Sequence, residues 1–292
     1  MISIAMPTYN GEKYLAEQID SILNQSIVDF ELVISDDCST DGTWLILEQY
    51  AQRDNRIRIF RNDKNLGYIK NYEKVLSLTN GEYIAMSDQD DVWSIDHLEI
   101  LYNNLGTKVL CCGNVSLVRE DGSETGRTWG DMYLSNVMPN DDLEKLMSII
   151  FMRGCYQGAS MLFKRSLLDK MLPFPENIKY HDLWISCVAC LYGGINYVHK
   201  SIGKYRIHGN NLSGNHDNSH SRWKFFKSMC RWGMNPDRIH YILGLKSLPL
   251  KDRRQIQIIL FMEKAYNRKR KIWGHFLNMI FVFKNLRTIY CI

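Results

Sequence analysis

The chain has 292 residues, enough for one large α/β domain or two smaller ones with a buried core. Hydrophobic residues make up 45% and charged residues 23%, which excludes a largely disordered protein. No run of about 18 apolar residues occurs, and residues 1–7 have the pattern of a strand rather than of a signal peptide. We therefore expect a cytosolic chain without a transmembrane helix.

The first hundred residues alternate the patterns of strands and helices. Short apolar runs bounded by turn residues predict strands at 2–8, 30–35, 56–60 and 83–87. Amphipathic patterns predict a helix after each of the first three. Such alternation predicts a mostly parallel sheet covered by helices, in which ligands bind beyond the carboxyl ends of the strands.

The following residues are less regular. Further strands are predicted at 109–118, 158–163, 195–198 and 203–207, and helices at 141–152 and from about residue 182. Helix patterns dominate from residue 221 onward. The pairs Cys111–Cys112 and Cys187–Cys190 lie in apolar runs, which favours core packing over a disulfide or zinc site.

Acidic residues follow two of the predicted strands. Asp36 and Asp37 end the second strand, and Asp88, Asp90 and Asp91 follow the fourth. Crowded carboxylates repel one another unless a cation neutralises them, and this spacing suits Mg²⁺ or Mn²⁺. The alternative is a solvated loop whose aspartates cap helices, the role that we favour for Asp41.

Four motifs give the chain a resemblance to a known family. Read in order, they are Met-Pro-Thr-Tyr-Asn-Gly at 6–11, Ser-Asp-Asp-Cys-Ser-Thr-Asp-Gly-Thr at 35–43, Asn-Leu-Gly at 65–67 and Ser-Asp-Gln-Asp-Asp-Val-Trp at 87–93. The chain resembles family 2 glycosyltransferases of the GT-A fold, and the resemblance continues to about residue 215. It implies a GT-A domain at 1–219, with a nucleotide-binding half at 1–91 and an acceptor half at 92–219.

The resemblance also implies the nucleotide-sugar site. Its residues are expected in the loops that follow the strands, with Asp36 or Asp37 reading the pyrimidine base. The full expected set is Pro7, Tyr9, Asn10, Glu12, Asp36, Asp37, Asn65, Gly67, Asp88, Arg206 and His208. Arg206 and His208 would add positive charge beside the diphosphate. A surface ion pair for Arg206 and a simple loop position for His208 remain the alternatives.

The same resemblance assigns the metal ligands and the base. Asp88 and Asp90 match the metal-binding motif, with Asp90 as the direct ligand of Mg²⁺ or Mn²⁺. Asp182 matches the general base, although His181 stands where family members usually have Glu.

The implied reaction is an inverting glycosyl transfer. The metal would stabilise the diphosphate leaving group while Asp182 takes the proton of the acceptor hydroxyl. Similar motifs occur in rhamnosyltransferase-like enzymes of bacterial polysaccharide and O-antigen assembly, so the donor is dTDP-rhamnose or a UDP-sugar. A nucleotidyl- or phosphotransferase and a non-catalytic glycan-binding relative remain open.

The C-terminal region differs in charge from the rest. Residues 1–219 carry a balance of −9, and residues 220–292 one of +13. Segments 222–231 and 268–287 mix cations with aromatic residues, which favours peripheral contact with an anionic membrane surface and a lipid-linked acceptor. We expect a basic helical region, located at the inner face of the cell membrane. A helical cap packed on the domain is the alternative, and nucleic acid is excluded because the acidic body would repel it.

Overall fold

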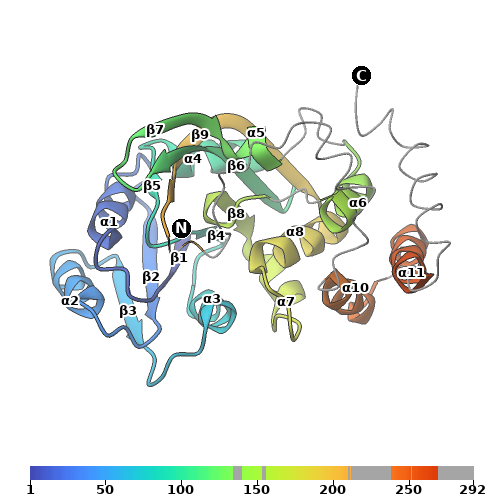
Figure 1. Cartoon of the computed structure of the whole chain (residues 1–292), viewed down its shortest axis with the longest axis horizontal. Coiled ribbons are helices and arrows are strands. Elements are labelled where there is room, and N and C mark those ends of the chain that lie inside the picture. Colours follow the sequence, from blue (N-terminus) through green and yellow to red (C-terminus); the bar gives the residue numbers. More distant parts are fainter. Residues whose placement is uncertain (134–139, 153–155, 210, 212–237, 251, 269–292) are drawn as a thin grey trace.

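The computed structural model describes residues 1–133, 140–152, 156–209, 211, 238–250 and 252–268 (Figure 1). Its strands are β1 (Ile2–Thr8), β2 (Phe30–Asp36), β3 (Ile57–Arg61), β4 (Tyr83–Met86), β5 (Val92–Trp93), β6 (Leu110–Arg119), β7 (Glu124–Thr128), β8 (Met161–Lys164) and β9 (Ile195–Ile207). Its helices are α1 (Leu15–Leu23), α2 (Thr43–Arg53), α3 (Tyr68–Ser77), α4 (His97–Leu105), α5 (Trp129–Tyr133), α6 (Asp142–Met152), α7 (Leu168–Met171), α8 (His181–Tyr192), α10 (Arg238–Ser247) and α11 (Arg253–Arg268). Short 3₁₀ turns lie at η1 (Gly158–Ser160) and η2 (Arg165–Leu167).

The first half of the sheet is parallel. Strands β3, β2, β1 and β4 lie side by side in this order, all running the same way. Every residue of β1 and β2 is buried, as expected for strands with helices on both faces. Thr8 lies opposite Asp36, so the carboxyl ends of β1 and β2 meet at one edge. The predicted strands and the α/β fold class are confirmed here.

The second half of the sheet is mixed. Strand β8 pairs antiparallel with both β4 and β6, whereas β9 runs parallel to β6. The run predicted as a strand from Gly158 begins with the turn η1, and pairing starts at Met161. The two strands predicted at 195–198 and 203–207 form the single strand β9, because a register shift near Asn114 of β6 accommodates the polar residues between them.

Two apolar cores lie on opposite faces of the sheet. One joins the sheet to α1, α2 and α4, and the other joins it to α3, α6 and α8. Helices α10 and α11 contribute to the second core through residues such as Tyr241 and Met262. The hydroxyl of Tyr241 accepts hydrogen bonds from the backbone N–H groups of Lys179 and Tyr180, at 3.1 and 2.9 Å. Residues 238–250 and 252–268 of the basic region therefore pack on the domain.

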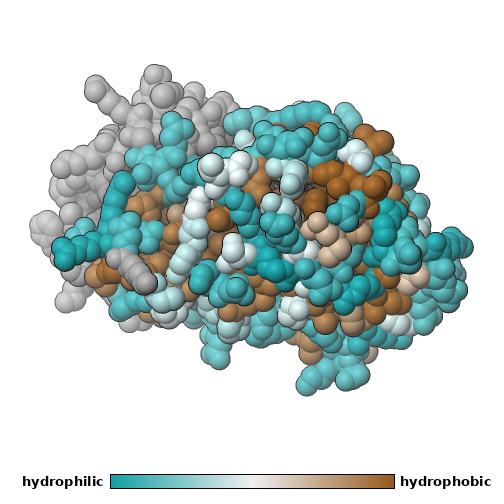
Figure 2. Space-filling model, turned by 180° about the vertical axis from the view of Figure 1, so that it is seen from behind, coloured by the Kyte–Doolittle hydropathy of each residue, from teal (hydrophilic) through white to brown (hydrophobic). Residues whose placement is uncertain are grey.

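On the face seen from behind, apolar residues gather in one area at the upper right, and hydrophilic residues cover much of the rest of the described part (Figure 2). Exposed large apolar side chains come from separate elements, for example Leu45 of α2 and Leu243 of α10. Among the described residues, no helix has both the length and the apolar character needed to cross a membrane. Cys111, Cys112, Cys187 and Cys190 are buried, as core packing predicts.

Candidate active site

The loop after β1 is held by side chains from two neighbouring loops. The amide of Gln89 pairs with the backbone of Tyr9, accepting from its N–H at 2.9 Å and donating to its carbonyl at 3.0 Å. Asn10 adopts a left-handed backbone (φ 48°), which asparagine tolerates better than most residues. Its N–H donates to Ser39 Oγ at 2.9 Å, and its side-chain oxygen accepts from the N–H of Thr40 at 2.9 Å.

Glu12 and Asp41 join the same loop to the start of α2. A carboxylate oxygen of Glu12 accepts from the N–H of Gly42 at 2.6 Å, and Asp41 accepts from the N–H of Glu12 at 3.2 Å. Asp41 also accepts from the N–H of Thr43, the first residue of α2, but the N-cap position is Gly42, so Asp41 precedes the cap that was expected of it. Pro7 lies buried in β1 just before this loop.

Asp36 is buried at the end of β2. Its carboxylate accepts from Thr8 Oγ1 at 3.1 Å and from the N–H and hydroxyl of Ser39 at 3.0 and 2.5 Å. The Arg61 guanidinium lies 3.6 Å from the same carboxylate. Asp36 therefore ties the loop after β2 to the end of β1.

Asp37 organises the loop before α3. Its carboxylate accepts from Asn62 Nδ2 at 2.7 Å and from the N–H groups of Leu66 and Gly67 at 2.8 and 2.9 Å. Asn65 accepts from the same N–H of Gly67, whose φ of +83° favours glycine. The predicted nucleotide-binding residues Asn65 and Gly67 are thus placed by Asp37.

The carboxylates after β4 lie close together. Asp88 accepts a 2.5 Å hydrogen bond from the Tyr72 hydroxyl. Burial, together with the negative charges of Asp90 and Asp182, raises the pKa of Asp88 to about 7 although this hydrogen bond opposes the rise. Asp90 lies 2.8 Å from the Nε2 atom of His208. The structure thus brings the predicted base Asp182 into electrostatic range of the predicted metal ligands.

Asp91 is directed into the protein. It is 4% exposed and accepts from the backbone N–H of Arg206 at 3.3 Å and from Gln157 Nε2 at 3.4 Å. Burial and the charges of Asp90 and Asp88 raise its pKa well above the usual range. Asp91 therefore links β9 and η1 to the acidic loop.

Arg206 is fully engaged within the chain. Its guanidinium pairs with Glu17 at 2.6 Å, donates to the carbonyls of Asp90 and Glu120 at 3.2 Å each, and lies over the Tyr14 ring at 4.9 Å. The same Tyr14 ring stacks on the His208 ring, with 5.2 Å between the ring centroids. The end of β9 is thereby fastened to α1 and to the acidic loop.

Asp182 occupies the first turn of α8. Its carboxylate accepts from the N–H of Leu183 at 2.7 Å. The preceding His181 is 1% exposed and stacks on Tyr72. Burial lowers the pKa of His181 to about 3, so its ring is neutral.

The acidic loop fits a hard divalent cation by its chemistry. Within the ranges that the structure describes, no three His, Cys, Asp or Glu side chains form a ready-made metal cluster. Mg²⁺ usually binds one or two carboxylates and completes its shell with phosphate oxygens and water, so Asp88 and Asp90 suffice. Besides burial, repulsion from the neighbouring carboxylates raises the pKa of Asp88. A bound divalent cation would offset this repulsion.

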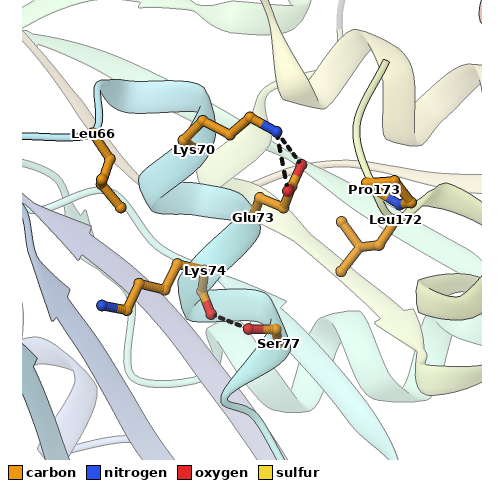
Figure 3. A pocket seen from close by; sticks show the side chains of 7 residues that line it. All are labelled: Leu66, Lys70, Glu73, Lys74, Ser77, Leu172 and Pro173. Atoms are coloured by element: carbon orange, nitrogen blue, oxygen red, sulfur yellow. Dashed lines mark hydrogen bonds and ion pairs between the residues drawn. The ribbon is translucent and has the colours of Figure 1, made fainter. Parts of the chain in front are cut away.

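A groove lies between α3 and the segment that leads to α8. One cavity of about 630 Å³ is lined by α3 residues from Lys70 to Ser77, by Leu66 and by Leu172 and Pro173 (Figure 3). A second, of about 420 Å³, is lined by residues 66–70 and 178–180. Tyr68 lines the second cavity, and its ring meets the ring of His181, the residue before Asp182, at 5.1 Å between centroids. Asp88, Asp90 and Asp182 are not among the residues that line either cavity.

Several residues of the site are absent from the sequence-based set. Gln89 fixes the loop after β1, and Tyr72 donates a hydrogen bond to Asp88. The Tyr14 ring contacts both the Arg206 guanidinium and the His208 ring. Gln89 lies inside the acidic motif, which is the signal that points to it. Tyr72 and Tyr14 follow ordinary helical patterns and carry no such signal.

Comparisons with known proteins agree with this geometry. The model of glycosyl transferase family 2 matches residues 3–172. The chain is 27% identical to glycosyltransferase TuaG of Bacillus subtilis, named for teichuronic acid biosynthesis, over 83% of this chain and 90% of TuaG. The structure of S. aureus TarS with UDP-GlcNAc is similar, with a TM-score of 0.62 at 22% identity, over 93% of this chain and 74% of TarS. The mannosyltransferase PcManGT of Pyrobaculum calidifontis, in complex with GDP-Man and Mn²⁺, gives 0.52 at 18% identity, over 98% of this chain and 80% of that one.

Proposed function

The chain belongs to glycosyl transferase family 2, and from this membership we propose that it transfers a sugar from a nucleotide diphosphate with inversion at the anomeric carbon. The family and the GT-A fold expected from the motifs are confirmed, and the chain is a glycosyltransferase. The observation that supports the proposed mechanism best is the convergence of Asp88, Asp90 and Asp182. Burial, with the added charges of Asp90 and Asp182, raises the pKa of Asp88 to about 7, which supports this assignment.

We assign the metal to Asp88 and Asp90. Enzymes of this fold commonly use a divalent metal, and PcManGT binds Mn²⁺. When bound, Mg²⁺ or Mn²⁺ acts as a Lewis acid that stabilises the negative charge on the leaving diphosphate. We assign His208, whose Nε2 lies 2.8 Å from Asp90, to contact with the same phosphates. We assign Arg206 an indirect role, because its guanidinium donates a hydrogen bond to the carbonyl of Asp90 and so holds the acidic loop.

We assign the proton transfer to Asp182. A sugar hydroxyl is a poor nucleophile until a carboxylate accepts its proton during the attack. The Asp182 carboxylate accepts a hydrogen bond from the backbone N–H of Leu183, and its charge acts on Asp88, which supports its assignment as the base beside the acidic loop. We assign the acceptor to the groove that Tyr68 lines.

We assign the nucleotide to the loops after β1, β2 and β3. Asp36 and Asp37 hold these loops in fixed positions, which leaves the backbone and side chains of residues 7–12 and 65–67 along one edge of the sheet. Ligands of open parallel sheets bind at this edge.

The donor is dTDP-rhamnose or a UDP-sugar, and the acceptor is a glycan or lipid-linked chain in bacterial surface polysaccharide synthesis. TuaG is named for teichuronic acid biosynthesis, and the TarS structure holds UDP-GlcNAc, which supports this class of product and donor.

A panel of dTDP- and UDP-sugars with Mn²⁺ tests the proposal. Donor turnover should occur with at least one sugar nucleotide and collapse in Asp90→Ala. Asp63→Asn, in an exposed position on another loop, is the matched control and should retain full activity. Turnover that is equal in Asp90→Ala and wild type would refute the assignment.

We further propose that the basic C-terminal residues contact an anionic membrane. Segments 222–231 and 268–287 lie outside the described residues, apart from Arg268 at the end of α11. Truncation at 219, the domain boundary that we propose, would remove core residues such as Tyr241, so neutralising substitutions are the better test. Flotation with phosphatidylserine vesicles should be lost when the Lys and Arg of 222–231 become Gln. Equal flotation of variant and wild type would dismiss membrane contact through that segment.

A further inference from the structure

The Tyr72 hydroxyl makes the closest contact to Asp88. It donates to Asp88 Oδ1 at 2.5 Å, and the backbone oxygen of Ser87 lies farther away at 3.1 Å. A phenol is protonated at neutral pH, so this contact is a donated hydrogen bond to a carboxylate. One oxygen of Asp88 is thereby occupied and the carboxylate plane is fixed, which leaves the other oxygen for a ligand.

The Tyr72 ring is held by His181. The two rings stack with 3.8 Å between centroids and 20° between planes, and the Tyr68 ring meets His181 edge-on at 5.1 Å. Tyr72 is fully buried and His181 is 1% exposed. Both ring nitrogens of His181 lack a hydrogen-bond partner within the described residues. Burying imidazole nitrogens without hydrogen bonds lowers the stability of the fold. The observed contacts of the His181 ring are with the Tyr68 and Tyr72 rings, so we infer that packing against them is its contribution.

We propose that Tyr72 is a positioning residue for Asp88 and that His181 holds the Tyr72 ring in register through their stack. This inference rests on the proposed function, in which Asp88 binds the metal. Hydrogen bonds to a ligating carboxylate orient the ligand and commonly change metal affinity by 10- to 100-fold.

The same arrangement accounts for histidine at position 181. A carboxylate at this position would lie against a ring that already contacts Asp88. His181 presents a flat face and carries no charge, because burial lowers its pKa to about 3. Gly158 leaves room for this ring, since a Cβ atom at Gly158 would lie 3.0 Å from His181 Nε2.

Mn²⁺ binding to the full chain tests the inference. Free Mn²⁺ is counted by electron paramagnetic resonance during a titration at saturating UDP, with a UDP-only blank. Tyr72→Phe, which removes only the hydroxyl, should weaken Mn²⁺ binding by about 10-fold. Tyr68→Phe is the matched control, because within the described part of the chain the Tyr68 hydroxyl donates to no carboxylate, and it should stay within twofold of wild type.

Two substitutions at position 181 test the stack. His181→Phe keeps a flat ring on Tyr72 and should stay within threefold of wild type, whereas His181→Ala should lose as much affinity as Tyr72→Phe. Near-ultraviolet circular dichroism and the unfolding midpoint show that each variant is folded. Unchanged Mn²⁺ affinity in Tyr72→Phe overturns the role of Tyr72. A loss in His181→Phe equal to that in His181→Ala overturns the stacking role. If wild type binds no Mn²⁺, the proposed metal site fails instead.

Discussion

Replacement of Asp37 tests how the candidate nucleotide site is built. The Asp37 side chain is 2% exposed and accepts three hydrogen bonds, two at Oδ1 and one at Oδ2. In Asp37→Asn the amide oxygen can take the place of Oδ1, while the new NH₂ faces the N–H of Gly67. That N–H retains its bond to Asn65. In Asp37→Ala all three donors lose this partner.

The expected costs follow from these counts. Hydrogen bonds to a charged acceptor contribute roughly 1.5–3 kcal/mol each, so Asp37→Asn should lower the free energy of unfolding by about 2 kcal/mol. For Asp37→Ala we expect about 4 kcal/mol, less than three full bonds because water reaches the opened loop. Both variants should also weaken UDP binding, because the loop that holds Asn65 and Gly67 is released.

Urea unfolding followed by circular dichroism gives the free energies, and calorimetry gives UDP affinity. Asp63→Asn, on the same loop and exposed, is the control and should change stability by less than about 0.5 kcal/mol. If Asp37→Ala is as stable as this control, the carboxylate does not organise the loop.

Three further outcomes are expected. A Cβ atom at Gly11 would lie 2.3 Å from Gln89 Oε1, so Gly11→Ala should displace Gln89 and weaken UDP binding several-fold. Gln89→Ala should weaken UDP binding by a similar factor, and the double variant should be little worse than either; fully additive losses would place the clash elsewhere. Burial and neighbouring charge raise the pKa of Asp88 from 3.8 to about 7, so the folded chain keeps a proton that the unfolded chain releases; without metal, the free energy of unfolding should therefore fall as pH rises from about 4 to about 7. Asp88→Asn should flatten that fall in urea titrations, and an unchanged pH profile would contradict the raised pKa. Asp182→Asn should lower kcat by about 10²- to 10⁴-fold with UDP affinity unchanged, and a loss of UDP binding would contradict its assignment as base.

The sequence predicts the parallel half of the fold well. Strands β1 to β4 are short apolar runs bounded by turn residues, and they alternate with helices, the pattern that predicts parallel neighbours. In the mixed half, strands such as β4 and β8 pair antiparallel, a direction that no local pattern encodes. The merging of 195–207 into one strand likewise depends on the register with β6.

The candidate site divides in the same way. Asp36, Asp37, Asp88 and Asp90 are found from their positions after strands, because that edge of a parallel sheet collects ligands. The side chains that hold Asp88 in place come from distant parts of the chain. Tyr72 lies on α3 and His181 on α8, and their numbers differ by 109. The engagement of Arg206 by Glu17 joins residues 189 positions apart and follows from packing alone.

Calorimetric titration of UDP into the full chain, with Mn²⁺ and with EDTA, tests the central claim most directly. If the carboxylates after β4 share a divalent ion with the donor diphosphate, UDP should bind with Mn²⁺, bind far more weakly in EDTA, and lose the difference in Asp90→Ala. Equal UDP affinity with Mn²⁺ and with EDTA in the wild-type chain would contradict the claim.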